Sequence, residues 1–197
     1  TYRGCNALTE AVCGPNVVNM NRTYENCPNL RIAACGDNVQ TMYNAFYNCA
    51  NLTTAACGNN VTNMTFTYYG CTNLKNAVCG PNVTELYYTY QKCGIIEAVC
   101  GPNVINMHGA YYDCKSLTTA ACEPNVINMC STYRNCRSLI APVCGPNVTN
   151  MSYTYTSCSN LTGNPVCGPN VTNMVYTYSG CGNLTGDPIC GDNVTNM

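Results

Sequence analysis

Cysteine gives this sequence most of its chemical potential, because 19 of its 197 residues are cysteines. That density is typical of exported chains held together by disulfides, so we expect a location outside a reducing cytosol. Eighteen of the cysteines fall into two series, each with a period of 21 to 23 residues, and Cys130 belongs to neither. The first series is Cys5, Cys27, Cys49, Cys71, Cys93, Cys114, Cys136, Cys158 and Cys181, and the second is Cys13, Cys35, Cys57, Cys79, Cys100, Cys122, Cys144, Cys167 and Cys190.

Catalysis and metal binding find little support in these residue types. The single histidine is His108, and nothing in the sequence marks a low-pKa thiolate beside it. The cysteine spacings of 7 to 9 and of 14 residues lack the close pairs that zinc and iron–sulfur sites use. We therefore predict no enzyme activity, no metal site and no cofactor. Cys130 is expected to be a buried thiol, with a free thiol or a cross-link to another chain as alternatives.

Charge is sparse along the whole chain. Only 9% of the residues are charged and the formal net charge is −1, so copies of the chain have little electrostatic reason to stay apart. This predicts self-association, end to end or side by side. The 8 Lys and Arg residues are scattered and cannot form a phosphate-neutralising patch, which argues against a nucleic-acid partner. The apolar runs are too short to insert into a bilayer.

The cysteines are part of a repeat that occurs nine times. Three residues before each first-series cysteine is an aromatic residue, and every copy carries Asn-Val followed three residues later by Met, except at Leu86. Fixed apolar columns at this period predict a solenoid, because one short coil cannot bury its apolar side chains alone but stacked coils can. We expect residues 1–197 to form one array of nine coils of about 22 residues, as a segment of a longer array. The invariant asparagines are Asn16, Asn38, Asn60, Asn82, Asn103, Asn125, Asn147, Asn170 and Asn193.

Local patterns indicate how each coil is built. The segment before a second-series cysteine, such as 74–79, fits a short strand, and stacked strands would give a parallel sheet on one face. The arc from Met to the next cysteine, as in 151–158, has spacings of three and four residues that favour a short helix or 3₁₀ turn over an extended piece. Each invariant asparagine sits at a turn, where its amide can bond its own turn and the next coil, which predicts a buried asparagine ladder.

The stretches NVTNMSYTYTSCSNL (147–161) and NVTNMTFTYYGCTNL (60–74) resemble the BspA-like leucine-rich repeats of bacterial, mycoplasma and protist surface proteins. The resemblance covers all nine copies. It implies a right-handed leucine-rich-repeat coil stack with a surface or adhesive role and no catalytic residues. The copies here are shorter than the family's, and small residues such as Ala77 and Pro165, together with cysteine, replace two strand leucines. These replacements predict a thinner and flatter coil.

Small inner residues would leave room for the two cysteine series to meet across each coil, as in disulfide-stapled insect solenoids. We predict nine in-coil disulfides, each joining a first-series cysteine to the second-series cysteine of the same copy. Each would contribute about 2.5 kcal/mol through loop-closure entropy. A ladder of reduced, buried cysteines is the alternative.

One apolar column is predicted to point outward, since it alternates with inward strand positions. An outward aliphatic stripe on a surface of low charge is typical of an interaction face, so we predict lateral packing or docking of a partner there. The column comprises Val12, Ala34, Ala56, Val78, Val99, Ala121, Val143, Val166 and Ile189.

Several asparagines lie in Asn-x-Ser/Thr motifs. Those of the asparagine ladder should be buried and unmodifiable, whereas Asn63 and Asn150 are better candidates for exposure and glycosylation.

Together these features predict an extracellular or cell-surface structural protein that forms a rod, stalk or fibre at a cell or virion surface. One alternative is an adhesin that binds a host surface protein or glycan. A second is an ice-binding solenoid, which would need an outward threonine array. The threonine column is interrupted by alanine and is expected to face inward; it comprises Thr23, Thr67, Thr89, Thr132, Thr154 and Thr177.

Overall fold

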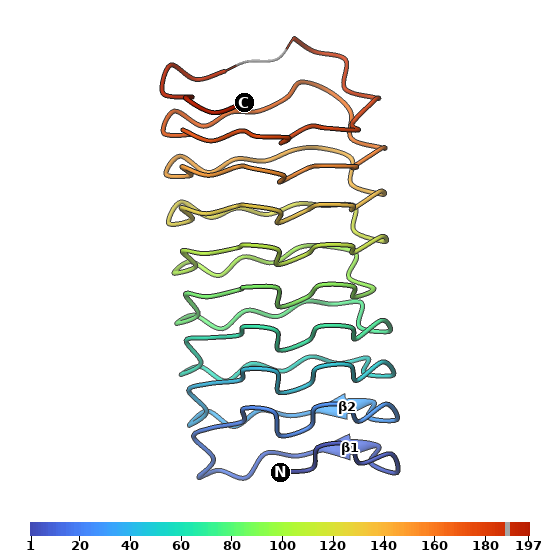
Figure 1. Ribbon diagram of the computed structural model, residues 1–197. Coiled ribbons are helices and arrows are strands. Elements are labelled where there is room, and N and C mark those ends of the chain that lie inside the picture. The colour runs from blue at the N-terminus through green and yellow to red at the C-terminus, as the bar shows by residue number, and fades with distance from the viewer. Residues whose placement is uncertain (188–189) are drawn as a thin grey trace.

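The computed structural model describes residues 1–187 and 190–197. The chain winds into a stack of coils, with the two termini at opposite ends of the stack (Figure 1). Two short strands, β1 (Glu10–Ala11) and β2 (Ile32–Ala33), pair in parallel, with Glu10 opposite Ile32. The described residues contain no helix. The predicted repeat stack is therefore present, but its coils are built mainly from turns and single bridges.

A ladder of parallel bridges runs along the residue that precedes each methionine position. Asn63 bridges to Thr41 in one neighbouring coil and to Glu85 in the other. The predicted strand at 74–79 is wrong in its extent, because among the described residues that arc pairs only through β1 and β2 and through isolated bridges at Asn76, Glu97 and Thr119. The continuous ladder lies on the other arc and comprises Asn19, Thr41, Asn63, Glu85, Asn106, Asn128, Asn150, Asn173 and Asn196.

Tyrosine hydroxyls replace sheet pairing in the arc before the second-series cysteines. The Tyr111 hydroxyl donates to the carbonyl of Val99 at 2.7 Å and accepts from the peptide N–H of Val99 at 2.9 Å. Both peptide groups of Val99 are thus satisfied within their own coil. The same pair of contacts joins Tyr68 to Ala56, Tyr90 to Val78, Tyr133 to Ala121, Tyr155 to Val143 and Tyr178 to Val166.

The two strands occur where this tyrosine contact is missing. Ala34 is the equivalent residue in its coil, but the aromatic residue 12 positions later is Phe46, which has no hydroxyl. The peptide N–H of Ala34 donates instead to the carbonyl of Ala11 in the preceding coil at 2.9 Å. Competition for the same peptide groups therefore explains why the predicted sheet is confined to the first coils.

The arc from Met to the first-series cysteine is a run of turns rather than a helix. Thr67 N donates to Met64 O at 3.0 Å within the coil, whereas Phe66 N donates to Tyr87 O in the next coil at 2.9 Å. Phe66 and Gly70 have φ values of 52° and 74°, in the left-handed region. The prediction of a short helix or 3₁₀ turn is wrong, because alternate peptide donors serve the neighbouring coil and left-handed residues interrupt the helical dihedrals.

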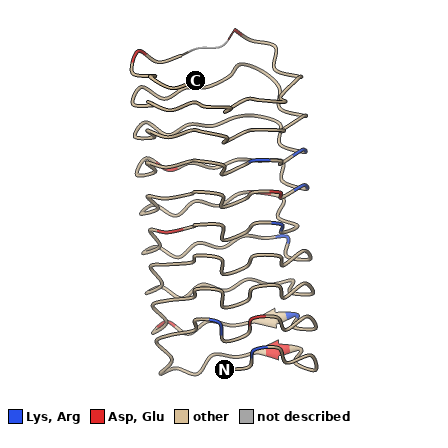
Figure 2. Ribbon diagram, viewed as in Figure 1, with Lys and Arg blue, Asp and Glu red and all other residues tan. Residues whose placement is uncertain are grey.

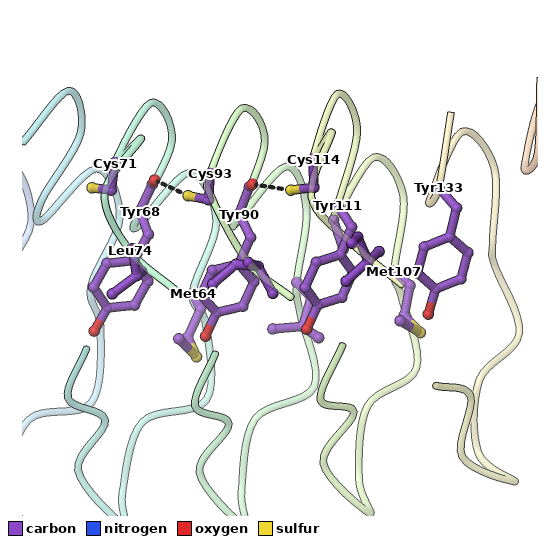
Figure 3. Close-up of a cluster of buried hydrophobic side chains, with 14 of the residues drawn as sticks. Met64, Tyr68, Cys71, Leu74, Tyr90, Cys93, Met107, Tyr111, Cys114 and Tyr133 are labelled. Atoms are coloured by element: carbon purple, nitrogen blue, oxygen red, sulfur yellow. Dashed lines mark hydrogen bonds between the residues drawn. The ribbon is translucent and has the colours of Figure 1, made fainter. Parts of the chain in front are cut away.

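The core is built of columns in which like side chains lie over like. The aromatic column stacks from the first coil to the last, with ring centroids 5.3 to 5.8 Å apart and interplanar angles of 12° or less. Tyr68, Tyr90 and Tyr111 lie side by side in Figure 3, with Met64 and Leu74 close to the rings. All five of these side chains are fully buried. The apolar columns of the repeat therefore form one continuous core.

The threonine column is also internal. The Thr154 hydroxyl donates to the carbonyls of Met129 and Met151, both at 2.7 Å. It thereby links two coils from inside the stack. The buried members of this column are Thr67, Thr89, Thr132, Thr154 and Thr177.

Charged residues are thinly scattered along the stack (Figure 2). The closest ion pair in the described residues joins Arg3 to Glu25 at 3.3 Å, and it lies in the first coils. Hydrogen bonds and stacking between coils, rather than ion pairs, therefore hold the array together.

Candidate functional site

The first-series thiols bond the backbone of the aromatic column. Cys93 Sγ donates to the carbonyl of Tyr68 at 2.9 Å, and Cys114 Sγ donates to the carbonyl of Tyr90 at 2.9 Å (Figure 3). The same contact with the preceding coil recurs along the series from Cys27 onward. These thiols therefore add one inter-coil hydrogen bond for each coil.

The second-series thiols lie near the hydroxyl end of the tyrosines. Cys57 Sγ is 3.7 Å from Met64 Sδ, and the adjacent residue Ala56 bonds the Tyr68 hydroxyl. Most of these sulfurs also fill space beside a glycine of the next coil; Cys100, whose counterpart there is Glu123, is an exception. A Cβ atom at Gly101 would lie 2.7 Å from Cys79 Sγ, closer than real contacts allow. The glycine after a second-series cysteine is thus explained by packing.

The predicted in-coil disulfides are wrong for this structure, in which all 19 cysteines are free thiols. The reason is the place of the aromatic column. The carbonyl of Tyr68 contacts the first series at Cys93, whereas its hydroxyl lies beside the second series at Cys57. A column of rings therefore stands between the two columns of sulfur, while a disulfide needs sulfur atoms about 2.05 Å apart. The reduced alternative is the one that the structure has.

Burial keeps the column thiols protonated. It raises the pKa of Cys49 and of Cys158 to about 12 and that of Cys57 to about 11. Since the thiolate is the nucleophile, these thiols are unreactive near neutral pH. Their role is packing.

Cys130 differs from both series. It occupies the column directly after Met, between His108 of the preceding coil and Ser152 of the next. The Ser152 hydroxyl donates to Cys130 Sγ at 3.2 Å. Burial opposes ionisation, but hydrogen bonds to His108 and Ser152 and the nearby His108 charge outweigh it and lower the pKa of Cys130 to about 7. The sequence did not mark a low-pKa thiol beside His108, and the expectation that Cys130 is a buried thiol is wrong, because Cys130 is half-buried.

The repeat register contained the signal for this cluster. His108 and Cys130 each follow the Met position directly and are one period apart, so an in-register stack must place them side by side. The cluster continues into the preceding coil, where the Tyr88 hydroxyl lies 3.1 Å from His108 Nε2. Tyr88, His108, Cys130 and Ser152 therefore form a row of polar side chains across four coils.

The invariant asparagines form a ladder at the surface. Asn103 Nδ2 donates to the carbonyl of Pro81 at 2.8 Å, and Asn147 Nδ2 donates to the carbonyl of Pro124 at 2.9 Å. Equivalent bonds to the preceding coil are made by Asn38, Asn60, Asn82, Asn125, Asn170 and Asn193. Because these residues are exposed, the predicted burial of the ladder is wrong.

A long open groove runs beside the asparagine ladder and has a volume of about 1350 Å³. One side is formed by the ladder from Asn60 to Asn193. The other consists of the residues that follow each Val, including Ile105 and Ile127, which are 43% and 46% exposed. Amides, hydroxyls and two apolar side chains in one groove suit an extended polar ligand. The sequence did not reveal this groove, since the asparagines were expected inside.

The predicted assembly face is only partly exposed. Val12 is 77% exposed and Ala34 is exposed, but the later members are half-buried, and Val143 packs against the core. The adjacent second-series cysteines are half-buried as well, so the arc does not alternate sharply between inward and outward residues. The half-buried members are Ala56, Val78, Val99, Ala121, Val143 and Val166, and Ile189 lies outside the described residues.

The two candidate glycosylation sites lie in the bridge ladder and are half-buried. Asn63 Oδ1 accepts from Thr65 N at 2.8 Å, and Asn150 Oδ1 accepts from Ser152 N at 3.0 Å. Both side chains therefore support local backbone or side-chain structure through their oxygen atoms. Glycosylation at Asn63 and Asn150 stays a prediction.

Within residues 1–187 and 190–197, no three His, Cys, Asp or Glu side chains are grouped as a metal ion would need. In the same residues no helix is long and apolar enough to cross a membrane.

The in-register coils, the apolar columns and the bridge ladder define a repeat solenoid. A family model described as "BspA type Leucine rich repeat region (6 copies)" matches residues 1–118 and 45–162. The chain belongs to this BspA-type leucine-rich-repeat family, which confirms the resemblance seen in its motifs.

A solved structure has the same fold. A leucine-rich repeat protein from Bacteroides ovatus ATCC 8483 superposes with a TM-score of 0.75 at 16% sequence identity. The match covers 84% of this chain and 47% of that protein, so this chain spans about half of its length. No curated protein matches the sequence.

Proposed function

We propose that this chain is a structural rod at a cell surface, with mechanical reach and surface contact as its task. The observation that supports this role is the unbroken stack. The aromatic column and the bridge ladder each run the length of the array, and every coil takes hydrogen bonds from its neighbours. A solenoid of this kind is extended by adding copies, without a change in cross-section. Membership of the BspA-type family supports the surface location.

The rod is tested by comparing the chain with a variant that lacks residues 58–100. This deletion removes two whole periods and joins Cys57 to Gly101, so the repeat register is kept. Small-angle X-ray scattering should give the same cross-sectional radius for both proteins and a shorter length for the variant. A compact particle, or a cross-section that changes with the deletion, would contradict the rod. Immunolabelling of intact cells that produce the chain tests its surface location.

A second candidate function is adhesion through the groove beside the asparagine ladder. It is favoured by the exposed amides and hydroxyls together with Ile105 and Ile127. A triple variant in which Thr84, Ile105 and Ile127 are all replaced by Lys should lose binding to immobilised extracellular glycans and matrix proteins. The matched control is Thr53→Lys, at an exposed threonine that does not line the groove. Equal binding by the two variants would show that the groove is not the binding site.

Lateral assembly through the aliphatic column is proposed for its exposed members, with Val12 as the most exposed. Sedimentation of Val12→Lys should then show weaker self-association than the unchanged chain. Ice binding is not proposed, because the threonine column that would have to face ice is buried.

A further inference from the structure

The row of polar side chains around Cys130 has no part in the rod. Cys130 is half-buried, so its sulfur is neither sealed in the core nor fully exposed. Ser152 donates to this sulfur at 3.2 Å, and Ser131 Oγ lies 3.8 Å from it. Gly109 N, directly after His108, donates to the Cys130 carbonyl at 2.9 Å, which makes His108 the neighbour of Cys130 in the preceding coil. Two hydroxyls and this imidazole therefore lie next to one thiol.

The His108 ring is itself held in place. Its Nε2 lies 3.1 Å from the Tyr88 hydroxyl, and its ring packs against Tyr87 with centroids 4.9 Å apart. Burial raises the pKa of Tyr88, so that hydroxyl keeps its proton near neutral pH. The imidazole is thus a fixed base beside a thiol, which is the arrangement that activates cysteine nucleophiles.

We propose that Cys130 is a covalent attachment site that exchanges with low-molecular-weight disulfides. The Cys130 proton passes to His108, and the thiolate attacks one sulfur of the incoming disulfide. One sulfur–sulfur bond forms to Cys130 as the original one breaks, and the departing thiolate takes up the proton from His108. One disulfide is consumed and one is made, so no other oxidant is required. This chemistry needs a thiolate and an approach path, both of which a half-buried thiol on the outer turn arc provides.

Nearby charge favours an anionic disulfide. Arg134 lies 5.6 Å above the ring of Tyr112 and 5.5 Å above that of Tyr153, on the same turn arc as Cys130. The Tyr88 hydroxyl, which contacts His108, is influenced by Cys130, Tyr112 and Arg134 alike, so the arginine belongs to the same surroundings. Its positive charge would attract the carboxylates of a disulfide such as glutathione disulfide.

Selectivity follows from the contrast with the column thiols. At pH 7 about half of Cys130 is thiolate, whereas a thiol with a pKa of about 11, such as Cys57, is ionised in roughly one molecule in 10⁴. Thiolates of higher pKa are intrinsically more nucleophilic, which offsets part of this difference. A preference of about 100-fold for Cys130 remains. The structure thus provides one reactive thiol among buried thiols of much lower reactivity, and the exposed Cys190 lies at the end of the stack.

The test is exposure of the purified chain to glutathione disulfide at pH 7, followed by intact mass measurement and peptide mapping. With the exposed Cys190 replaced by Ser in every protein compared, one adduct, at Cys130, is expected. Cys130→Ser should abolish it, and serine is well tolerated in this column because Ser152 occupies the same position one coil later. Cys57→Ser is the control and should leave the adduct unchanged. Adducts spread over several cysteines of the native chain, or an unmodified Cys130, would overturn the proposal.

The role of His108 is tested separately with His108→Asn. Loss of the base should return the thiol toward its ordinary pKa of 9.0 and slow adduct formation about 5- to 10-fold at pH 7. At pH 10, where the thiolate forms in either protein, the variant should no longer be the slower one, because its thiolate of higher pKa is intrinsically more nucleophilic. If this variant unfolds, many thiols will react. The pH–rate profile of the unchanged chain then decides, since an inflection near pH 7 supports the proposal and one near pH 9 overturns it.

Discussion

The hydroxyl of Tyr111 binds both peptide groups of Val99, donating to its carbonyl at 2.7 Å and accepting from its N–H at 2.9 Å. One side chain thereby performs the hydrogen bonding that a neighbouring strand would perform in a sheet. The contact recurs in six coils, and it is replaced by the β1–β2 pairing where Phe46 takes the place of tyrosine. The aromatic column is therefore both the core of the rod and the support of its outer arc.

Tyr111→Phe should lower the free energy of unfolding by about 1 to 3 kcal/mol, because both peptide groups of the half-buried Val99 lose their partner. Urea unfolding measures this change. Tyr112→Phe is the matched control, since Tyr112 is half-buried and its hydroxyl has no such contact to Val99. A Tyr111 variant as stable as this control would show that the hydroxyl contact is not needed.

Gly101→Ala should destabilise the stack by about 1 to 3 kcal/mol through overpacking. The added Cβ would lie 2.7 Å from Cys79 Sγ and 3.1 Å from the carbonyl oxygen of Gly80. Gly182→Ala is the control, because nothing lies within 4 Å of its Cβ position. The double variant with Cys79→Ala should recover part of the loss. Thermal unfolding compares the four proteins, and equal effects of the two glycine substitutions would contradict the packing argument.

Asn103→Asp tests the asparagine ladder with almost no change in shape. The aspartate cannot donate to the Pro81 carbonyl, which the Asn103 amide does at 2.8 Å. Because the side chain is exposed, water replaces part of the lost bond and we expect a loss of only about 0.5 to 1.5 kcal/mol. A loss as large as that of Tyr111→Phe would indicate a buried ladder after all. Chemical denaturation monitored by tyrosine fluorescence gives both values.

Alkaline pH should destabilise the fold. Burial raises the folded-state pKa of the column thiols, as at Cys49 and Cys79 with values of about 12, above the unfolded value of about 8.5. Between these values the unfolded chain loses thiol protons that the folded chain retains, so unfolding becomes more favourable as pH rises. The stabilisation is complete below about pH 8 and is lost progressively above it. Urea midpoints of the Cys130→Ser variant, which lacks the thiol that ionises near pH 7, should under reducing conditions be constant from pH 6 to 8 and fall by pH 10. A midpoint that does not change up to pH 10 would show that the thiols are not buried.

Aligning the nine copies predicts which side chains stack, because repeats in register must place equivalent residues together. The aromatic core and the inward threonines follow from it, and so does the proximity of His108 to Cys130 once both are assigned to one column. The alignment does not predict which hydrogen-bond partner a peptide group takes within a coil. A tyrosine hydroxyl competes with sheet pairing for the same peptide groups, and the sequence shows only that both are available.

The errors about cysteine and asparagine have a related cause. A thiol that donates to a carbonyl, as Cys93 does to Tyr68, leaves the same spacing in the sequence as a thiol joined to a partner. An exposed amide that bonds the neighbouring coil, as Asn103 does, is as invariant as a buried one. Invariance across copies therefore reports a repeated contact, without reporting how deeply it is buried.

The central claim is that a column of aromatic rings separates the two columns of free thiols. Its most direct test is alkylation of the denatured but non-reduced chain, followed by mass mapping of every cysteine. The account predicts that all 18 series cysteines are alkylated. Nine disulfides joining pairs such as Cys71 and Cys79 would contradict it, because the rings could not then lie between them.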